Sequence, residues 1–302
     1  NWKRLCLPYL ERQQWKYNFS SLSASISYYG GKMKKFSLLL LVFLTLFMFS
    51  CSEKDDNPTN VDFYGYKLDQ FISNTILRDL IDPNASDTLN FRELFAYEIE
   101  ASDGFSPRNS SYAGYDLTWN FFKEGYIVPA DNNRTWFPDE LGLPNAFKVK
   151  STTQFNLYRK VEVTSGESSK TIELKGLTIY TIPNWNSANE EAIKLRDLLQ
   201  GISLSDSSNI RLIAIDDYYK DYTPEQIAEG YYLLDSEVTT FPEINDTLPG
   251  ALKKFKKLAN IEVTNGSSQD HNFANAPHDK KDIAIPVPAN FSGYEATPLP
   301  DY

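Results

Sequence analysis

The sequence predicts a mixed α/β protein, of the α+β or α/β class, made of two tandem, internally duplicated domains with mixed sheets and short helices. Two observations predict it. Short segments recur in the same order along the chain, at offsets between 100 and 118 residues; this period is too long for a solenoid and fits a small domain used twice. Within each copy, strand-like and helix-like segments follow one another without strict alternation, as in a mixed sheet.

Six pairs of segments carry the duplication, and their shared order is what makes them significant. They are LRDL at 77–80 and 195–198, EIEASDGF at 98–105 and RLIAIDDY at 211–218, DLTWNFFKEGYI at 116–127 and DYTPEQIAEGYY at 221–232, FP at 137 and 241, LP at 143 and 248, and VEVT at 161 against IEVT at 261. We expect each pair to occupy equivalent positions in the two copies.

Each copy begins with a predicted amphipathic helix that ends in LRDL. The second copy shows it most clearly as SANEEAIKLRDLL at 187–199, where Ser187 can cap the helix and Glu190 lies three residues further on. A strand follows, YEIEA at 97–101 in the first copy and IRLIAI at 210–215 in the second.

Each of these strands ends in a predicted turn, at Asp103-Gly104 and at Asp216-Asp217. Aspartate suits turns because its side chain bonds to backbone N–H groups nearby. We therefore expect Asp103 and Asp216 to be equivalent turn residues.

A short helix comes next in each copy. Thr118 and Thr223 are the expected N-caps, and Pro224 suits the first helical position. Gly125 and Gly230 are expected to end these helices. A closing strand then completes each copy.

The chain divides on this basis into six segments. They are a stretch upstream of a plausible initiator methionine at 1–32, a lipoprotein signal peptide at 33–50, a lipidated tether at 51–63, a first repeat domain at 64–168, a second at 169–265, with the junction near 164–175, and a Pro- and Asn-rich tail at 266–302.

A secretory signal begins at Met33, in MKKFSLLLLVFLTLFMFSCSEKDD. Two lysines precede an apolar or small run from Phe36 to Ser50, and Cys51 follows it directly. These are the n-region, h-region and cleavage site of a signal peptide. The run of 15 residues is short for a transmembrane helix, which needs about 20, so an uncleaved anchor is the weaker alternative.

The cysteine at the end of that run resembles the lipobox of bacterial lipoproteins, which implies lipidation of Cys51. The residues before it, 48–50, depart from the usual small-residue pattern at the middle position. Two or three acyl chains anchor a protein stably where one does not. The acidic SEKDD at 52–56 also resembles the export tag of surface-exposed lipoproteins in some Gram-negative bacteria. We expect an exported protein, anchored by lipid to the outer membrane on its periplasmic or its external face.

Composition narrows the function classes. From residue 51 onward the chain holds 23 Lys and Arg and 39 Asp and Glu, a net charge of −16, which opposes binding to nucleic acid and to anionic membrane surfaces. The only other cysteine, Cys6, precedes the signal. The folded domains therefore hold no disulfide, no zinc–cysteine site and no cysteine nucleophile.

The order of elements in each copy resembles the molybdopterin-binding domain of the sulfite oxidase type. That order is an L-DLL helix, a strand, a DGY-like turn, a short helix, a proline-containing loop and a terminal I-V strand. The turn occurs here at 103–105 and 216–218, and the terminal strand at 155–163 and 258–263. That family ligates molybdenum through a cysteine thiolate, a soft donor, and neither copy contains a cysteine. The resemblance implies the scaffold without the reaction. No cofactor is expected, and a molybdopterin-type cofactor held without thiolate ligation is the alternative.

Each group of side chains able to carry chemistry also has a simpler interpretation. Four bases, Arg108, Arg134, Lys148 and Arg159, offer partners to a cofactor phosphate, but without a Gly-rich phosphate loop they are better interpreted as scattered surface bases. The two histidines, His271 and His278, lie beside Asp270 and Asp279 in the polar tail, where they are weak candidates for a metal site.

Carboxylates and aromatic residues also have two interpretations. Asp103 with Asp116, or Asp216 and Asp217 with Asp221, could serve as the acid and base of a catalytic site. We prefer the simpler interpretation, in which these aspartates satisfy the backbone at turns and beside helix caps. Aromatic residues gather between 112 and 137; Trp119 is expected in the core. Tyr112, Tyr115 and Trp136 lie in irregular segments and are candidates, with Arg108 and Arg134, for contact with a ligand, a sugar or a protein partner.

The sequence thus predicts a non-catalytic cell-envelope lipoprotein that binds a ligand or takes part in assembly, through the aromatic loop or the groove between the copies. One alternative is a molybdopterin-type oxidoreductase relative. A second is a surface glycan-binding lipoprotein. The expected partners are the membrane, through the lipid, and an envelope protein or glycan.

Overall fold

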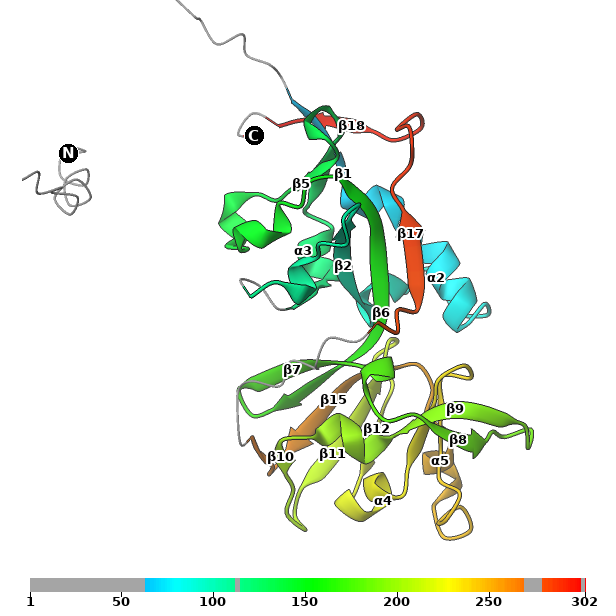
Figure 1. Ribbon diagram of the computed structural model, residues 1–302. Coiled ribbons are helices and arrows are strands. Elements are labelled where there is room, and N and C mark those ends of the chain that lie inside the picture. The colour runs from blue at the N-terminus through cyan, green and yellow to red at the C-terminus, as the bar shows by residue number, and fades with distance from the viewer. Residues whose placement is uncertain (1–62, 112–114, 269–278, 300–301) are drawn as a thin grey trace, which may run out of the picture. The chain divides into compact units, whose positions relative to one another are not determined.

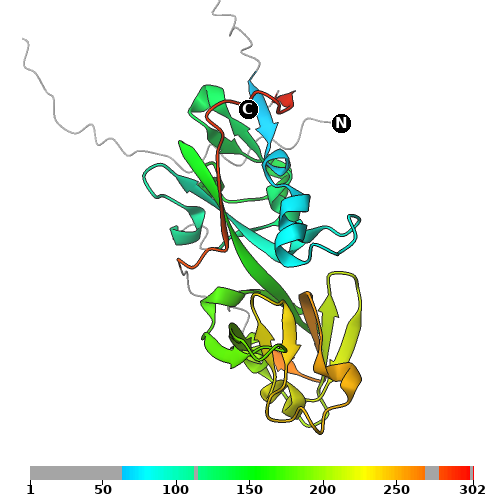
Figure 2. The same cartoon turned by 90° about the vertical axis from the view of Figure 1, so that its right-hand side faces the viewer.

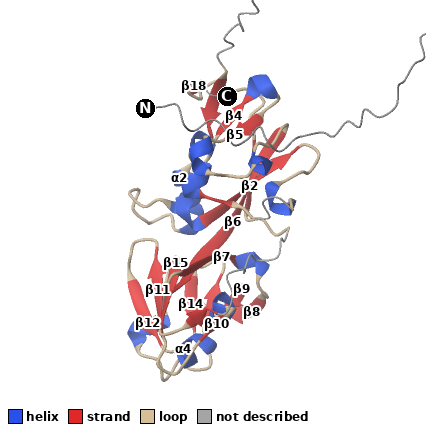
Figure 3. Cartoon of the chain, turned by 90° about the vertical axis from the view of Figure 1, so that its left-hand side faces the viewer, coloured by secondary structure: helices blue, strands red, loops and turns tan. Residues whose placement is uncertain are grey.

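Strands dominate the structure, and its helices are short (Figure 3). The computed structural model describes residues 63–111, 115–268, 279–299 and 302, all of which belong to one unit, 62–302. Within it, two large clusters of buried apolar side chains define two lobes. The mixed, sheet-rich class agrees with the predicted α+β character.

The first lobe combines the N-terminal part of the described chain with two strands from its C-terminal segment. Its elements are β1 (Tyr64–Lys67), η1 (Leu68–Phe71), α2 (Asn74–Ile81), η2 (Phe91–Leu94), β2 (Phe95–Ala101), η3 (Pro107–Asn109), β3 (Leu117–Thr118), α3 (Trp119–Phe122), β4 (Tyr126–Val128), η4 (Pro129–Asp131), β5 (Arg134–Trp136), η5 (Asp139–Leu141), η6 (Asn145–Phe147), the first half of β6 (Thr152–Ser165), β17 (Ile283–Pro286) and β18 (Ala296–Pro298).

The second lobe contains the rest of β6 and the elements that follow it. They are β7 (Ser168–Glu173), η7 (Leu174–Gly176), β8 (Tyr180–Pro183), β9 (Asn189–Lys194), η8 (Leu195–Leu199), β10 (Ile202–Ser203), β11 (Asn209–Ala214), β12 (Tyr219–Tyr222), α4 (Pro224–Ala228), β13 (Tyr231–Leu233), β14 (Val238–Thr240), α5 (Gly250–Lys253), β15 (Leu258–Thr264) and β16 (Ser267–Ser268).

Strand β6 belongs to both lobes. Its first half pairs antiparallel with β2 and β17, and its second half pairs antiparallel with β7 and parallel with β15. Figures 1 and 2 show β6 passing from one lobe into the other, with β17 beside its first half. Because Val161 and Val163 already pack in the second core, the chain changes cores within β6, ahead of the junction expected near 164–175.

The lobes repeat one pattern of backbone contacts. The N–H of Leu68 donates to the carbonyl of Gly125 at 2.9 Å, and that of Leu195 donates to Gly230 at 3.0 Å. In both lobes a three-residue strand, β4 or β13, is thereby placed between two antiparallel neighbours.

A threonine in each lobe makes a second matched contact. The Oγ1 of Thr135 accepts the N–H of Val149 at 2.9 Å, and the Oγ1 of Thr239 accepts the N–H of Phe255 at 2.8 Å. Each threonine N–H donates in return to the carbonyl of that same partner, at 2.8 Å in both lobes.

The predicted turns are present. The carboxylate of Asp103 accepts the N–H of Phe105 at 3.0 Å, and that of Asp216 accepts the N–H of Tyr218 at 3.4 Å. Gly104 has a φ of 81° and Asp217 a φ of 61°, a region that glycine adopts more readily than aspartate. Both aspartates therefore serve the turn.

The predicted helix over 187–199 is wrong. Residues 189–194 form β9, and only 195–199 coil, as the 3-10 segment η8. Ser187 lies in a turn with a φ of 63°, and the buried Glu190 accepts the N–H groups of Asp235 and Ser236. Pairing with β8 and β13 overrides the helical propensity of this segment.

Two of the six matched pairs do not occupy equivalent positions. The LRDL of 77–80 lies in α2, whereas that of 195–198 forms η8, whose backbone contacts correspond to those of η1. VEVT and IEVT are direct neighbours: Ile261 pairs with Val163 in the parallel β6–β15 ladder. The β-branched residues of both segments suit neighbouring strands of one sheet.

The short helices follow the capping predictions in part. Thr223 forms a full capping box with Gln226 ahead of Pro224 in α4. Thr118 occupies the N-cap of α3 without a side-chain cap hydrogen bond.

Gly125 and Gly230 follow these helices for a reason other than a left-handed turn. A Cβ atom at Gly125 would lie 2.3 Å from the Phe137 ring, and one at Gly230 would lie 2.6 Å from both Leu195 and Phe241. The backbone packs directly on a phenylalanine ring in both lobes.

Gly125→Ala and Gly230→Ala are each expected to lower the free energy of unfolding by about 1–3 kcal/mol, because overpacking forces ring or backbone shifts. Gly250→Ala is the control, since its Cβ would meet nothing within 4 Å. Urea denaturation measures all three. Equal stability of Gly230→Ala and Gly250→Ala would contradict this packing account.

Candidate functional site

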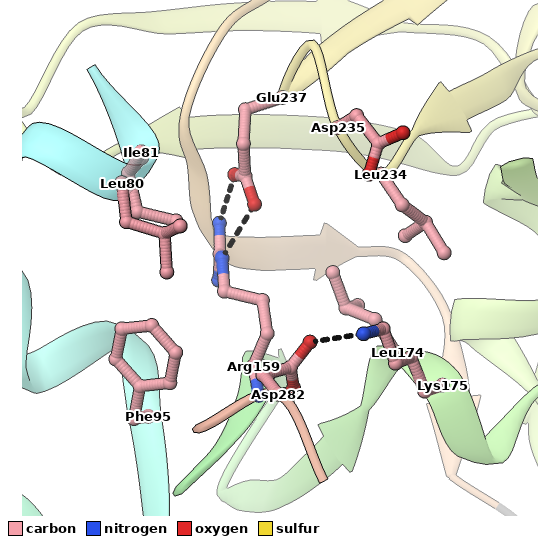
Figure 4. Close-up of a pocket in the computed structure, with 10 residues that line it drawn as sticks. All are labelled: Leu80, Ile81, Phe95, Arg159, Leu174, Lys175, Leu234, Asp235, Glu237 and Asp282. Atoms are coloured by element: carbon pink, nitrogen blue, oxygen red, sulfur yellow. Dashed lines mark hydrogen bonds and ion pairs between the residues drawn. The ribbon is translucent and has the colours of Figure 1, made fainter. Parts of the chain in front are cut away.

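A cavity of about 270 Å³ lies where the two lobes meet (Figure 4). We call it the junction cavity. Its lining residues come from both lobes and from the C-terminal segment, and they are Leu80, Ile81, Phe95, Arg159, Leu174, Lys175, Leu234, Asp235, Glu237 and Asp282.

The apolar wall is mostly aliphatic. Leu80 and Ile81 come from the last turn of α2, Phe95 begins β2, and Leu174 and Leu234 face them from the second lobe (Figure 4). Ser73 caps the start of α2, and Leu77 is the residue that this helix buries. The helix therefore leaves Leu80 58% exposed, in a cavity whose wall also contains the buried Phe95 and Leu174.

A buried ion pair forms the charged side of the cavity. The Nε and Nη2 atoms of Arg159 donate to the two carboxylate oxygens of Glu237 at 3.0 and 2.7 Å, and Figure 4 shows the two side chains approaching from opposite sides. The two side chains are only 4% and 5% exposed. Nη2 also donates to the Leu258 carbonyl at 2.6 Å, and Nη1 donates to the Lys160 carbonyl.

Tyr232 completes this network by donating its hydroxyl to Glu237 at 2.5 Å. Burial alone would lower the pKa of Arg159, but the charge of Glu237 outweighs it and raises that pKa. Burial, and then Glu237, raise the pKa of Tyr232. The Arg159–Glu237 pair is therefore held in place, with its hydrogen-bonding groups already engaged.

A second ion pair lies beside the first. Lys175 Nζ approaches Asp282 Oδ1 at 2.9 Å, and Asp282 Oδ2 accepts the backbone N–H of Arg159 at 2.6 Å. Asp282 thereby attaches the segment before β17 to β6 and to η7.

Asp235 supplies the remaining charge of the lining. Its backbone N–H donates to Glu190 at 2.9 Å, which holds the turn between β13 and β14. Asp235 is exposed to solvent, and among the described residues its carboxylate forms no ion pair. The lining thus carries one more carboxylate than bases, and the excess charge is at Asp235.

A second buried cluster of charged side chains has Arg108 at its centre. Its guanidinium donates to both oxygens of Glu173, at 3.0 and 2.7 Å, and to Asp116. The guanidinium also stacks 3.9 Å from the centre of the Tyr158 ring, and Tyr158 donates to Glu98 at 2.6 Å. Because Arg108 precedes β3 and Glu173 ends β7, the cluster connects the two lobes.

Burial, together with hydrogen bonding to Glu173, raises the pKa of Asp116 to about 9. The charge of Arg108 opposes this increase without cancelling it. The Asp116–Glu173 pair therefore holds a proton at neutral pH.

The interpretation of four bases as scattered surface groups is wrong for two of them. Arg108 and Arg159 are both buried in ion pairs. Arg134 pairs with Asp131 at 2.8 Å, and Lys148 pairs with Asp139 at 3.3 Å. The four bases have separate partners and form no common anion site.

The carboxylate candidates also separate. Asp103 and Asp216 bond within their turns, and Asp221 pairs with Arg211 at 2.9 Å near the surface. The turn interpretation fails for Asp116, which is buried against Arg108.

The aromatic candidates are partly exposed. Tyr115 is 44% exposed with its ring 5.4 Å from that of Phe147. Trp136 is half-buried between Tyr126 and Tyr302, at 5.6 and 6.4 Å. Trp119 is buried, as expected. Tyr112, Cys51, His271 and His278 lie outside the described residues.

Sequence reasoning missed most of the junction cavity. Arg159 gave the best available signal, because an arginine inside the apolar strand 155–163 predicts a buried partner. Nothing in the local sequence marks Glu237 or Asp282 as neighbours of Arg159, since they lie 78 and 123 residues further along the chain.

Comparisons with protein-family models, with curated proteins and with solved structures gave no match. Among the described residues, no helix is both long and apolar enough to cross a membrane, and no three His, Cys, Asp or Glu side chains gather as a metal site.

Proposed function

We propose that this chain is an exported lipoprotein, anchored through Cys51 to the outer membrane, whose folded part binds a small ligand in the junction cavity. The cavity itself carries this proposal. It lies between two lobes, where ligand sites are favoured, and it combines an apolar wall with a few placed polar groups. At about 270 Å³ it suits a ligand of small size.

The charges of the cavity favour binding over catalysis. Arg159 and Glu237 hold each other, and so do Lys175 and Asp282. These four side chains are held by one another, whereas general acid–base catalysis needs a group that exchanges a proton with substrate.

The two alternatives receive less support. A molybdopterin-type cofactor carries phosphate, which the excess carboxylate of the lining opposes. A glycan site needs exposed aromatic faces; Tyr115 offers one, but Trp136 packs against Tyr126 and Tyr302.

We also infer that the lobes are copies of one ancestral unit. Two matched contacts support the inference. Gly125 and Gly230 each accept a leucine N–H, and Thr135 and Thr239 each form the same two hydrogen bonds to the backbone of one residue. The resemblance to the molybdopterin-binding scaffold stays a proposal about that unit.

Membrane anchoring depends on Cys51 in this proposal. In a bacterial host, Cys51→Ala is expected to abolish labelling by radioactive palmitate and to move the protein out of the membrane fraction. Ser52→Ala, which changes the residue directly after Cys51, is the matched control and should change neither. Undiminished labelling of Cys51→Ala would contradict lipidation at this residue.

The binding site can be tested with isohexanol, a neutral aliphatic probe. We expect saturation-transfer NMR to detect its binding to the full chain in detergent, and Leu80→Trp to abolish it by filling the cavity mouth. Ile76→Trp is the matched control, because Ile76 is 67% exposed on the same helix and does not line the cavity. Binding that survives Leu80→Trp would place the site elsewhere.

A further inference from the structure

The junction cavity also indicates the chemistry of its ligand. We infer that it takes a primary ammonium group carried on a short aliphatic body, with the ammonium at Asp235 and the aliphatic part against Leu80, Leu174 and Leu234. The inference rests on the proposed binding function and adds the ligand class to it.

The sign of the ligand's charge follows from the lining. Three carboxylates and two bases line the cavity, and two ion pairs neutralise all of these groups except Asp235. An anion would have to displace Asp282 from Lys175 or Glu237 from Arg159. Separating the buried pair would leave an uncompensated charge, which is costly.

A cation needs no such exchange. It meets Asp235 directly, and a charge-assisted hydrogen bond to a carboxylate is stronger than a neutral one. The carboxylate of Asp282 also lines the cavity, but Lys175 and the Arg159 backbone N–H engage its two oxygens, so Asp235 is the carboxylate left for the cation.

The body of the ligand follows from the apolar wall. Its side chains are Leu80, Ile81, Phe95, Leu174 and Leu234, four of which are aliphatic. Sugars stack on aromatic faces, whereas branched aliphatic chains pack on leucine and isoleucine. Leu80, at 58% exposure, would lose the most solvent contact when a ligand binds.

Three probes with one carbon skeleton test the inference: isohexylamine, isohexanol and isohexanoate, titrated calorimetrically into the full chain in detergent at neutral pH and low salt. We expect isohexylamine to bind about tenfold more tightly than isohexanol, because a charge-assisted hydrogen bond replaces a neutral one. Isohexanoate should bind most weakly.

Asp235→Asn should remove the preference for isohexylamine and leave the affinity for isohexanol unchanged. Asp246→Asn, an exposed acid outside the cavity, is the matched control and should keep the preference. The result distinguishes the two levels of the proposal. Equal binding of isohexylamine and isohexanol, or preference for isohexanoate, would overturn the ammonium inference and leave the cavity as a binding site. Failure of all three probes to bind would overturn the proposed function as well.

Discussion

Replacing Asp116 with asparagine is expected to stabilise the protein at neutral and alkaline pH. Asp116 lies buried against Arg108 and Glu173, and its pKa is raised from 3.8 to about 9. At pH 7 the folded protein must therefore keep a proton that the unfolded chain releases. Asparagine reproduces the shape and hydrogen bonding of the protonated acid without that requirement.

The sign follows from proton linkage. Because the folded pKa lies above the unfolded one, the contribution of Asp116 to stability is fully present below about pH 4 and is lost as the pH rises toward 9. The loss is about 1.4 kcal/mol for each pH unit within that window. Asp116→Asn carries no proton that can be lost in this range. The variant should therefore exceed the wild type by roughly 4 kcal/mol at pH 7 and match it near pH 4.

Urea denaturation of both proteins across this pH range measures the difference. Asp221→Asn is the control: the hydrogen bond from Arg211 lowers the pKa of that exposed acid, so the same substitution should bring no gain at any pH. A wild type that is more stable than Asp116→Asn at pH 8 would show that Asp116 is ionised in the folded state.

Replacing Arg159 with methionine is expected to cost about 3–5 kcal/mol of the free energy of unfolding. The substitution leaves the Glu237 carboxylate buried with only Tyr232 as a donor, and an uncompensated buried charge is strongly destabilising. Methionine keeps most of the side-chain volume, so a cavity contributes little to the loss.

The double variant Arg159→Met/Glu237→Gln separates the charge effect from packing. Because it removes both charges, it should recover about 2 kcal/mol or more of the loss expected if the two substitutions were additive. Thermal or urea unfolding of the wild type, both single variants and the double variant gives the coupling energy. Strict additivity would contradict the tight pairing of these side chains.

The strands and turns of each lobe could be predicted from local sequence. Asp103 and Asp216 bond their own turns, and β2 and β11 occupy the segments expected as strands at 97–101 and 210–215. These features depend on residues that are close in sequence, so a single amino-acid sequence contains the signal for them.

The junction could not be predicted in the same way. β9 has helix-forming residues but pairs with β8 and β13. Strand β6 continues into the second lobe and joins the strands of both lobes in one eight-stranded sheet. Glu237 meets Arg159 across 78 residues. Such contacts depend on tertiary packing, which leaves no local signal in a single sequence.

The location of the ligand is the central claim, and intermolecular NOEs between isohexylamine and the methyl-labelled protein test it most directly. The account predicts NOEs from the methyl groups of the probe to the methyl groups of Leu80, Leu174 and Leu234. Bound probe without NOEs to these leucines, or with NOEs only to methyl groups outside the junction cavity, would contradict it.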